Sequence, residues 1–228
     1  MKALFFFALF YCCHLHAQDN TIIIKAGKSF SESVAITELY QYAEFTYGKV
    51  FFKSGDSTTA KMNYHRFMDA IQFIDLKGDT LKISNAPMIK SIRINNDVFY
   101  YDGNGYVNLL KVSNGIKFAE KRTLSVKSRE KIGAYGMASP TSSITSYSSL
   151  MTQNNIYNLV PMEDIALTKK TEYYFGDKYD KFATATKKGL QQQFSKQSKT
   201  VNAYLKDNAI DLNKKEDLEK LLEFLAGL

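Results

Sequence analysis

The chain has 228 residues, and 30 Lys and Arg against 23 Asp and Glu give it a formal net charge of +7. It contains 2 cysteines, 3 histidines and no tryptophan. Zinc sites need several Cys, His or carboxylate ligands, and Ser-His-Asp or Cys-His catalysis needs a histidine, so this composition disfavours both kinds of site.

Residues 1–17 have the three parts of a secretory signal peptide, with a positive start, an apolar run from Ala3 to Cys13 and a small residue before the cut. We expect cleavage between Ala17 and Gln18. The apolar run is far shorter than the ~20 residues that a retained membrane anchor needs. Cleavage removes both cysteines, so the mature protein is expected in the periplasm, in the cell envelope or outside the cell, without disulfides or a transmembrane segment.

Within the expected mature domain, residues 18–228, the stretch 45–131 has the pattern of an antiparallel β-meander. Clusters of Asn, Asp and Gly, such as residues 77–79, divide it into short runs rich in Val, Ile, Phe, Tyr and Thr. Apolar residues alternate with polar ones, as Ile92 and Ile94 do, and the connections are too short for crossover helices. We predict a single α+β domain with about seven to nine antiparallel strands in an open sheet or half-barrel.

His65 is the single histidine that remains after cleavage, and the pattern places it in a hairpin loop over residues 65–69. Loops on a rigid scaffold often carry function, so a metal-binding or catalytic histidine is one interpretation. The sequence marks no partner for such a role. We therefore expect a solvated loop residue whose substitution hardly changes the stability.

The sequence pattern changes after residue 131. Residues 132–158 are rich in Ser and Thr, which predicts a long loop, and a further strand is expected over 165–176. Residues 182–228 have a helical period and end in a predicted helical pair. The last helix carries a leucine stripe at one-face spacing, formed by Leu218, Leu221, Leu222, Leu225 and Leu228. We expect the stripe to pack within the domain, and a helix that docks on a partner or membrane is the alternative.

Six basic residues crowd a stretch that contains two acids, Glu120 and Glu130. This basic strip consists of Lys117, Lys121, Arg122, Lys127, Arg129 and Lys131. One interpretation is a positively charged sheet face that binds an anionic polymer or lipid. The alternative is a solvated edge strand, whose charge prevents the addition of another strand. No nucleic-acid-binding motif accompanies the strip, and export also disfavours nucleic acid.

Motifs for other chemistry are missing from the sequence. No phosphate-binding loop or nucleophile elbow is present, and we predict no cofactor. The stretch DGNGY at 102–106 lacks the alternating acids of a calcium loop and predicts a hairpin turn. Hydrolysis by two paired carboxylates stays open as an alternative, because it needs only two suitably placed acids.

Three stretches resemble a group of uncharacterised exported β-rich proteins common in Bacteroidota. They are HAQ at the cleavage site, AKMNY and IQFIDLKGDTLKI within 60–83, and the tail from ATKKGLQQQF to EKLLEFL. The resemblance implies no known activity and assigns no functional residue. We expect a non-enzymatic envelope protein that binds an anionic polymer, a lipid or a protein partner. The alternatives are a periplasmic carrier of a lipophilic ligand, with its cavity under the helices, and a carboxylate-dependent hydrolase.

Overall fold

The computed structural model describes residues 21–132, 138–141 and 160–228. The predicted cleavage site at Ala17 and Gln18 lies outside these residues, as does most of the segment 132–158. The strands are β1 (Thr21–Ile24), β2 (Thr46–Phe52), β3 (Ser57–His65), β4 (Ala70–Ile74), β5 (Thr80–Lys82), β6 (Ile89–Ile94), β7 (Asp97–Tyr101), β8 (Tyr106–Ser113), β9 (Ile116–Ile132), β10 (Ala138–Thr141), β11 (Asp164–Gly176) and β12 (Phe182–Thr184). The helices are α1 (Phe30–Ser33), α2 (Ile36–Leu39), α3 (Lys187–Gln193), α4 (Ser198–Asp207) and α5 (Lys215–Ala226), and short 3₁₀ turns lie at Ala86–Met88 and Ser195–Gln197.

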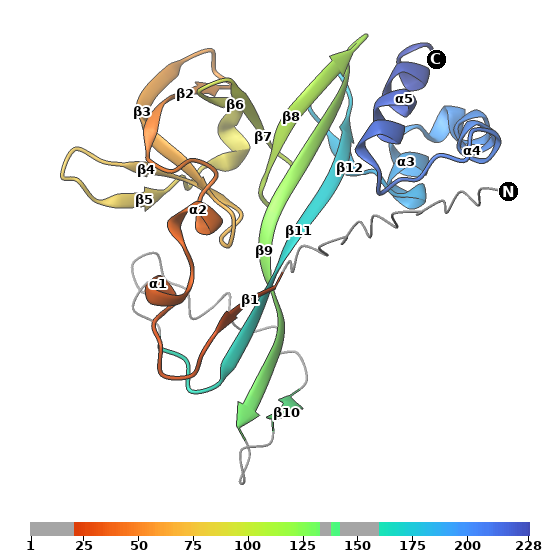
Figure 1. Ribbon diagram of the computed structural model, residues 1–228. Coiled ribbons are helices and arrows are strands. Elements are labelled where there is room, and N and C mark those ends of the chain that lie inside the picture. Colours follow the sequence, from red (N-terminus) through yellow and green to blue (C-terminus); the bar gives the residue numbers. More distant parts are fainter. Residues whose placement is uncertain (1–20, 133–137, 142–159) are drawn as a thin grey trace, which may run out of the picture.

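The strands form one open, antiparallel sheet, which confirms the predicted fold class (Figure 1). Its order is β1-β11-β9-β8-β7-β6-β2-β3-β4-β5, with β10 beside β9 and β12 beside β11. The eight strands β2 to β9 fall within the range expected for the meander. Hairpin turns lie where the sequence places Gly and Asn, because Gly78, Asn95 and Gly103 adopt φ angles of +90°, +52° and +105° that other residues avoid.

Strands β2 to β7 form a curled end of the sheet. Its concave face packs one core that includes Val50, Met62, Ile71, Ile92 and Phe99. Residues from alternate positions of each strand contribute to this core, as the period of two predicts. The chain then crosses from β5 back to β6, and Ile83 and Ala86 of the crossing segment pack into this core.

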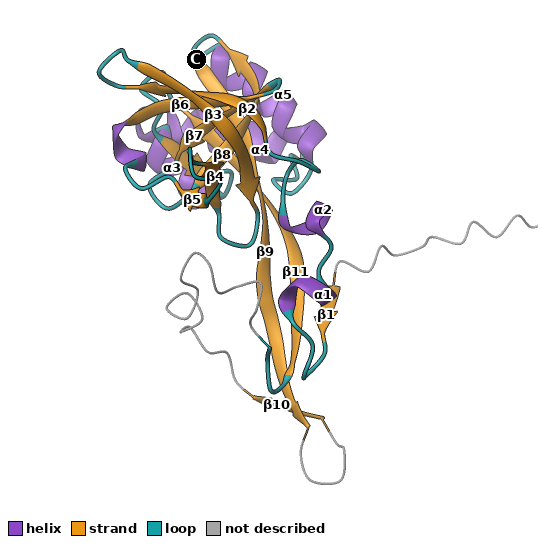
Figure 2. Cartoon of the chain, turned by 90° about the vertical axis from the view of Figure 1, so that its left-hand side faces the viewer, coloured by secondary structure: helices purple, strands orange, loops and turns teal. Residues whose placement is uncertain are grey.

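The long strands β9 and β11 form a twisted ribbon that leaves the rest of the sheet (Figure 2). At the far part of the ribbon, β1 pairs with β11, and α1 and α2 lie nearby. Phe30 and Leu39 of these short helices pack with Leu124 and Leu167 of the ribbon. The sequence pattern gave no element for this N-terminal segment, because helices of four residues show no period.

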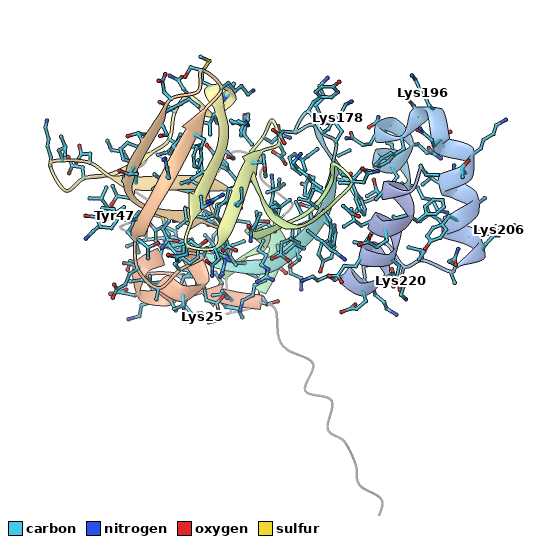
Figure 3. All side chains as sticks on the ribbon, turned by 90° about the horizontal axis from the view of Figure 1, so that it is seen from above. Lys25, Tyr47, Lys178, Lys196, Lys206 and Lys220 are labelled. Carbon is cyan, nitrogen blue, oxygen red and sulfur yellow. The ribbon has the colours of Figure 1, made fainter. Side chains whose placement is uncertain are left out.

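Helices α3 to α5 pack on the opposite side of the ribbon from the curled end (Figures 1 and 3). Their core contains Phe118 and Phe175 of the ribbon and four leucines of the stripe, namely Leu218, Leu221, Leu222 and Leu225. Intramolecular packing of the stripe is thus confirmed for these four, whereas Leu228 is 50% exposed. Residues 182–184, expected to be helical, form β12 instead because they pair with β11. Among the described residues, no helix is long and apolar enough to cross a membrane.

Replacing Leu221 with Ala should lower the free energy of unfolding by roughly 2–5 kcal/mol, because the side chain is fully buried and its loss leaves a cavity. Leu228→Ala is the matched control, and at a half-exposed terminal position it should change stability by less than about 0.5 kcal/mol. Urea denaturation of both variants and the wild type measures the difference. Equal unfolding curves for Leu221→Ala and the wild type would contradict the packing of α5.

Candidate functional site

A cleft of about 740 Å³ opens at the curled end, where β3 and β4 separate. Strand β2 pairs with β3 from Ser57 onward, whereas β4 pairs with β3 only from Lys61, which lies opposite Ile74. Beyond Ile74 the chain continues into the β4–β5 hairpin, which projects away from the other strands (Figure 1). The first residues of β3 and the β4–β5 hairpin therefore form two walls of the cleft.

Apolar side chains provide most of the lining of this cleft. They come from β2, β3, β4 and the start of β6, and include Val50, Met62, Phe73 and Ile89. The charged residues in the lining are Lys61 and Asp75, one of each sign. A concave apolar surface with few polar groups is typical of ligand-binding sites.

Large apolar side chains also lie at the mouth of the cleft. Tyr47 is 75% exposed and points outward from the curled end, on the side of the molecule opposite to the helices (Figure 3). Leu76 on the hairpin is fully exposed. Exposed apolar groups beside a concave apolar surface mark an interaction site more often than isolated ones do.

The cleft is not apparent in the amino-acid sequence. Residues 57–59 are Ser and Thr and show no apolar alternation, and the alternating pattern of this strand begins at Ala60. The separation of β3 from β4 depends on the direction that the hairpin takes after Ile74. The sequence contains one weak signal of an apolar surface here, which is Leu76 directly before the turn at 77–79.

His65 is the last residue of β3 and is completely buried. The prediction of a solvated loop residue is therefore wrong, although the hairpin exists and β4 begins at Ala70. The Met68 N–H donates to His65 Nδ1 at 3.2 Å, and the Tyr40 ring packs edge-on against the imidazole at 4.7 Å. Burial lowers the pKa of His65 from 6.5 to about 4, so the imidazole is neutral at pH 7.

The basic strip does not form one continuous surface. Because side chains alternate along β9, Lys117 and Lys121 lie on one face of the ribbon and Arg122 lies on the other. Each of these cations lies beside a carboxylate: Lys117 Nζ is 2.9 Å from Asp180, and Arg122 Nη2 is 2.8 Å from Glu120. Of the remaining three, Lys127 is exposed, and the side chains of Arg129 and Lys131 lie outside the described part of the chain.

Lys121 is the centre of a buried ion cluster. Its Nζ lies 2.8 Å from Asp69 Oδ2 and 2.7 Å from Asp102 Oδ2. The Tyr64 hydroxyl and the Tyr106 N–H donate to Asp69 Oδ1. The side chain of Lys121 is only 5% exposed, so this residue is not available to an anionic partner.

The pKa values of the cluster follow from its hydrogen bonds. Burial by itself would raise the pKa of Asp102, but hydrogen bonds from Lys121 Nζ and from the Gly105 and Asn104 N–H groups lower it below the ordinary value. Burial would likewise lower the pKa of Lys121, but its two carboxylate partners raise it. Both groups are therefore charged at neutral pH. The space beside them is about 10 Å³, which is enough for roughly one water molecule and not for a substrate.

A second recess, of about 560 Å³, lies between α2 and the ribbon. Four basic residues and one acid line it: Arg66, Arg122, Lys169, Lys170 and Glu38. The Arg66 guanidinium is held by the Thr37 and Glu38 carbonyls and by Gln41 Oε1. Arg122 is the one residue of the basic strip in this recess.

In the described part of the chain, metal-ligating and catalytic side chains are not grouped at the cleft or at the second recess. Within the residues that the structure describes, no group of three or more His, Cys, Asp or Glu side chains is placed to hold a metal ion. The cleft lining contributes one carboxylate, Asp75, and the second recess contributes one, Glu38. A pair of facing carboxylates is therefore not found in either.

Comparisons with protein-family models, with curated proteins and with solved structures gave no match to this chain. The likeness to exported proteins of Bacteroidota therefore stays a prediction.

Replacing Lys121 with Met should destabilise the protein by roughly 3–5 kcal/mol, because it leaves the Asp69 and Asp102 carboxylates without their cation. Lys127→Met on the same strand is the matched control, and its exposed side chain predicts a change below about 0.5 kcal/mol. Chemical denaturation at pH 7 measures both. Similar losses in the two variants would show that the cluster has no special role.

Because the pKa of His65 lies at about 4 in the folded protein and near 6.5 in the unfolded chain, the unfolded chain takes up a proton first as the pH falls. Stability should therefore decrease from pH 6.5 to pH 4, by up to roughly 3 kcal/mol from this residue. His65→Asn keeps an acceptor for the Met68 N–H but does not titrate, so its stability should fall less over the same interval. Denaturation curves at several pH values test this, and parallel pH profiles for the two proteins would contradict it.

Proposed function

We propose that this protein is a non-enzymatic, exported binding module of the cell envelope, and that the cleft between β3 and the β4–β5 hairpin holds the apolar part of its partner. The observation that carries the proposal is the cleft itself, with a volume of about 740 Å³ and a mainly apolar lining. Binding sites for molecules of drug size have volumes of roughly 300–1,000 Å³ and a similar lining.

The shape of the cleft favours a docked partner over a carried lipid. A carrier buries most of its ligand in an enclosed cavity, and the sequence placed that cavity under the helices. The space under α3 to α5 is instead filled by the leucine stripe and by Phe118 and Phe175. The cleft lies at the curled end and opens to solvent, with the exposed Tyr47 and Leu76 among its lining residues. A partner that also covers this opening buries more apolar surface than a free lipid does.

A carboxylate-dependent hydrolase receives no support from the site. Hydrolysis of this kind needs two acids on opposite sides of the bond that is cleaved. The cleft supplies Asp75 alone, and Lys61 is the other charged residue of its lining. The cleft is therefore suited to binding rather than to hydrolysis.

Binding of an anionic group at the second recess is another candidate function. The observation that favours it is the cluster of Arg66, Arg122, Lys169 and Lys170 around one space. Guanidinium groups suit carboxylate and phosphate oxygens. This candidate ranks second because three of the four cations already pair with an acid, namely Glu120, Glu38 and Glu172.

Titration with the neutral apolar dye N-phenyl-1-naphthylamine tests whether the cleft binds apolar groups. The wild type should bind the dye saturably, with a rise in fluorescence. Thr58→Arg places a long charged side chain at the mouth of the cleft, where the native side chain is exposed, and should weaken binding by about tenfold or more because charge is excluded from an apolar site.

Two controls separate the cleft from a general effect of charge. Thr58→Val keeps the size of the native side chain and should bind like the wild type. Met162→Arg adds the same charge at an exposed apolar residue that does not line the cleft, and should also bind like the wild type. No saturable binding by the wild type, or equal binding by Thr58→Arg, would overturn the proposal.

A further inference from the structure

The first residues of β3 have a strand partner on one side only. Residues Ser57–Ala60 pair with β2, whereas the pairing between β3 and β4 begins at Lys61. In the part of the chain that the structure describes, no strand lies against the other side of Ser57–Ala60. This edge borders the cleft, since Thr58, Thr59 and Ala60 are among its lining residues.

The hydrogen-bonding direction of each residue at this edge follows from the hairpin. The Phe52 N–H donates to the Asp56 carbonyl at 2.9 Å and closes the β2–β3 turn. Antiparallel pairs alternate, so the pair Val50–Thr58 exchanges hydrogen bonds between β2 and β3. Ser57 and Thr59 therefore turn their N–H and C=O groups away from β2 and toward the side on which β4 pairs farther along.

A charged side chain, a proline and a bulge, which commonly protect an edge against strand addition, are missing from this edge. Exposed edges typically carry a lysine, a proline or a bulge, or are very short. Residues Ser57–Ala60 are uncharged and lack proline, and their pairing with β2 has no irregularity. The outer strand β5, in contrast, is three residues long and ends in Lys82. The unprotected edge and the apolar cleft thus occur at the same place.

A hydrocarbon fits such an edge poorly. When an apolar chain enters the cleft, it displaces water from the N–H and C=O groups of Ser57 and Thr59 and leaves them without partners. A peptide in extended conformation replaces these water contacts with backbone hydrogen bonds, while its side chains fill the apolar part of the cleft. The edge therefore distinguishes a peptide from a lipid.

We propose that the occupant of the cleft is an extended peptide segment of another protein, which adds as an antiparallel strand to Ser57–Ala60 in line with β4. This inference rests on the proposed binding function of the cleft. The incoming segment has apolar residues at alternate positions, which face Val50, Phe73 and Ile89, and polar residues at the positions between them, which face outward. Its charge is close to neutral, because the lining carries only Lys61 and Asp75.

The first test uses a fluorescein-labelled peptide of eight residues with alternating valine and threonine. In an antiparallel pair, opposite residues share a face, so the threonines of the peptide lie opposite Ser57 and Thr59 and exchange hydrogen bonds with them. N-methylation of the threonine amides should weaken binding to the wild-type protein by about tenfold or more. N-methylation of the valine amides, which point away from β3, should leave binding close to that of the parent peptide. Equal binding of the two methylated peptides would overturn the inference.

The second test changes the protein. Thr59→Pro removes the N–H that turns toward the cleft, whereas the control Thr59→Val keeps it. Peptide binding should be lost in the proline variant and retained in the valine variant, and both should still bind the naphthylamine dye. In the wild type, the peptide should also slow amide hydrogen exchange at Ser57 and Thr59. If Thr59→Pro does not fold, the methylated peptides and the exchange rates decide the question.

The two proposals fail in different ways. Dye binding without peptide binding would overturn strand addition and leave the apolar cleft as the binding site. Loss of both would overturn both. Unchanged exchange at Ser57 and Thr59 with the peptide bound would show that it binds without adding a strand, which also overturns the inference.

Discussion

The contact between Lys121 and the two carboxylates of Asp69 and Asp102 joins the parts of this fold. Lys121 lies on the ribbon, Asp69 in the turn between β3 and β4, and Asp102 in the turn between β7 and β8. A buried ammonium group needs partners, and here they come from segments that are distant in the sequence. The cluster therefore fixes the curled end against the ribbon. Gly105 is part of this arrangement, because a Cβ atom there would overlap the Asp69 carboxylate.

Strand β3 therefore has one rigid end, which the cluster holds, and one end whose edge faces the cleft. At His65 it is covered by Tyr40 and by the turn that carries Asp69, so this end is held by packing and by the ion cluster. At Ser57–Ala60 it has one neighbouring strand, and its exposed side faces the cleft. A binding edge that continues a well-fixed strand loses little conformational freedom when a ligand binds, and preorganisation of this kind favours affinity.

The residues of the basic strip are distributed over different surfaces of the fold. Its lysines and Arg122 looked like one feature because they are close in the sequence. Alternation along β9 separates them onto two faces, and the partners Asp180, Glu120 and Asp102 neutralise three of them. Positive charge gathers instead in the recess where Arg66, Lys169 and Lys170 join Arg122 from two other segments. The sequence therefore predicted a cationic surface, but not its position in the fold.

Local rules sufficed for most strands and for the last helix, whereas distant contacts decided the pairing of β2 with β6, the formation of β12 and the site. The alternation of apolar residues, the Gly and Asn turns and the leucine stripe predicted the antiparallel hairpins and the buried face of α5, because each pattern involves neighbours within a few residues. The burial of His65, the neutralisation of Lys121 and the opening between β3 and β4 were not predictable in this way. Each depends on which segments the folded chain brings together, and the sequence pattern of a strand is the same whether its edge is paired or free.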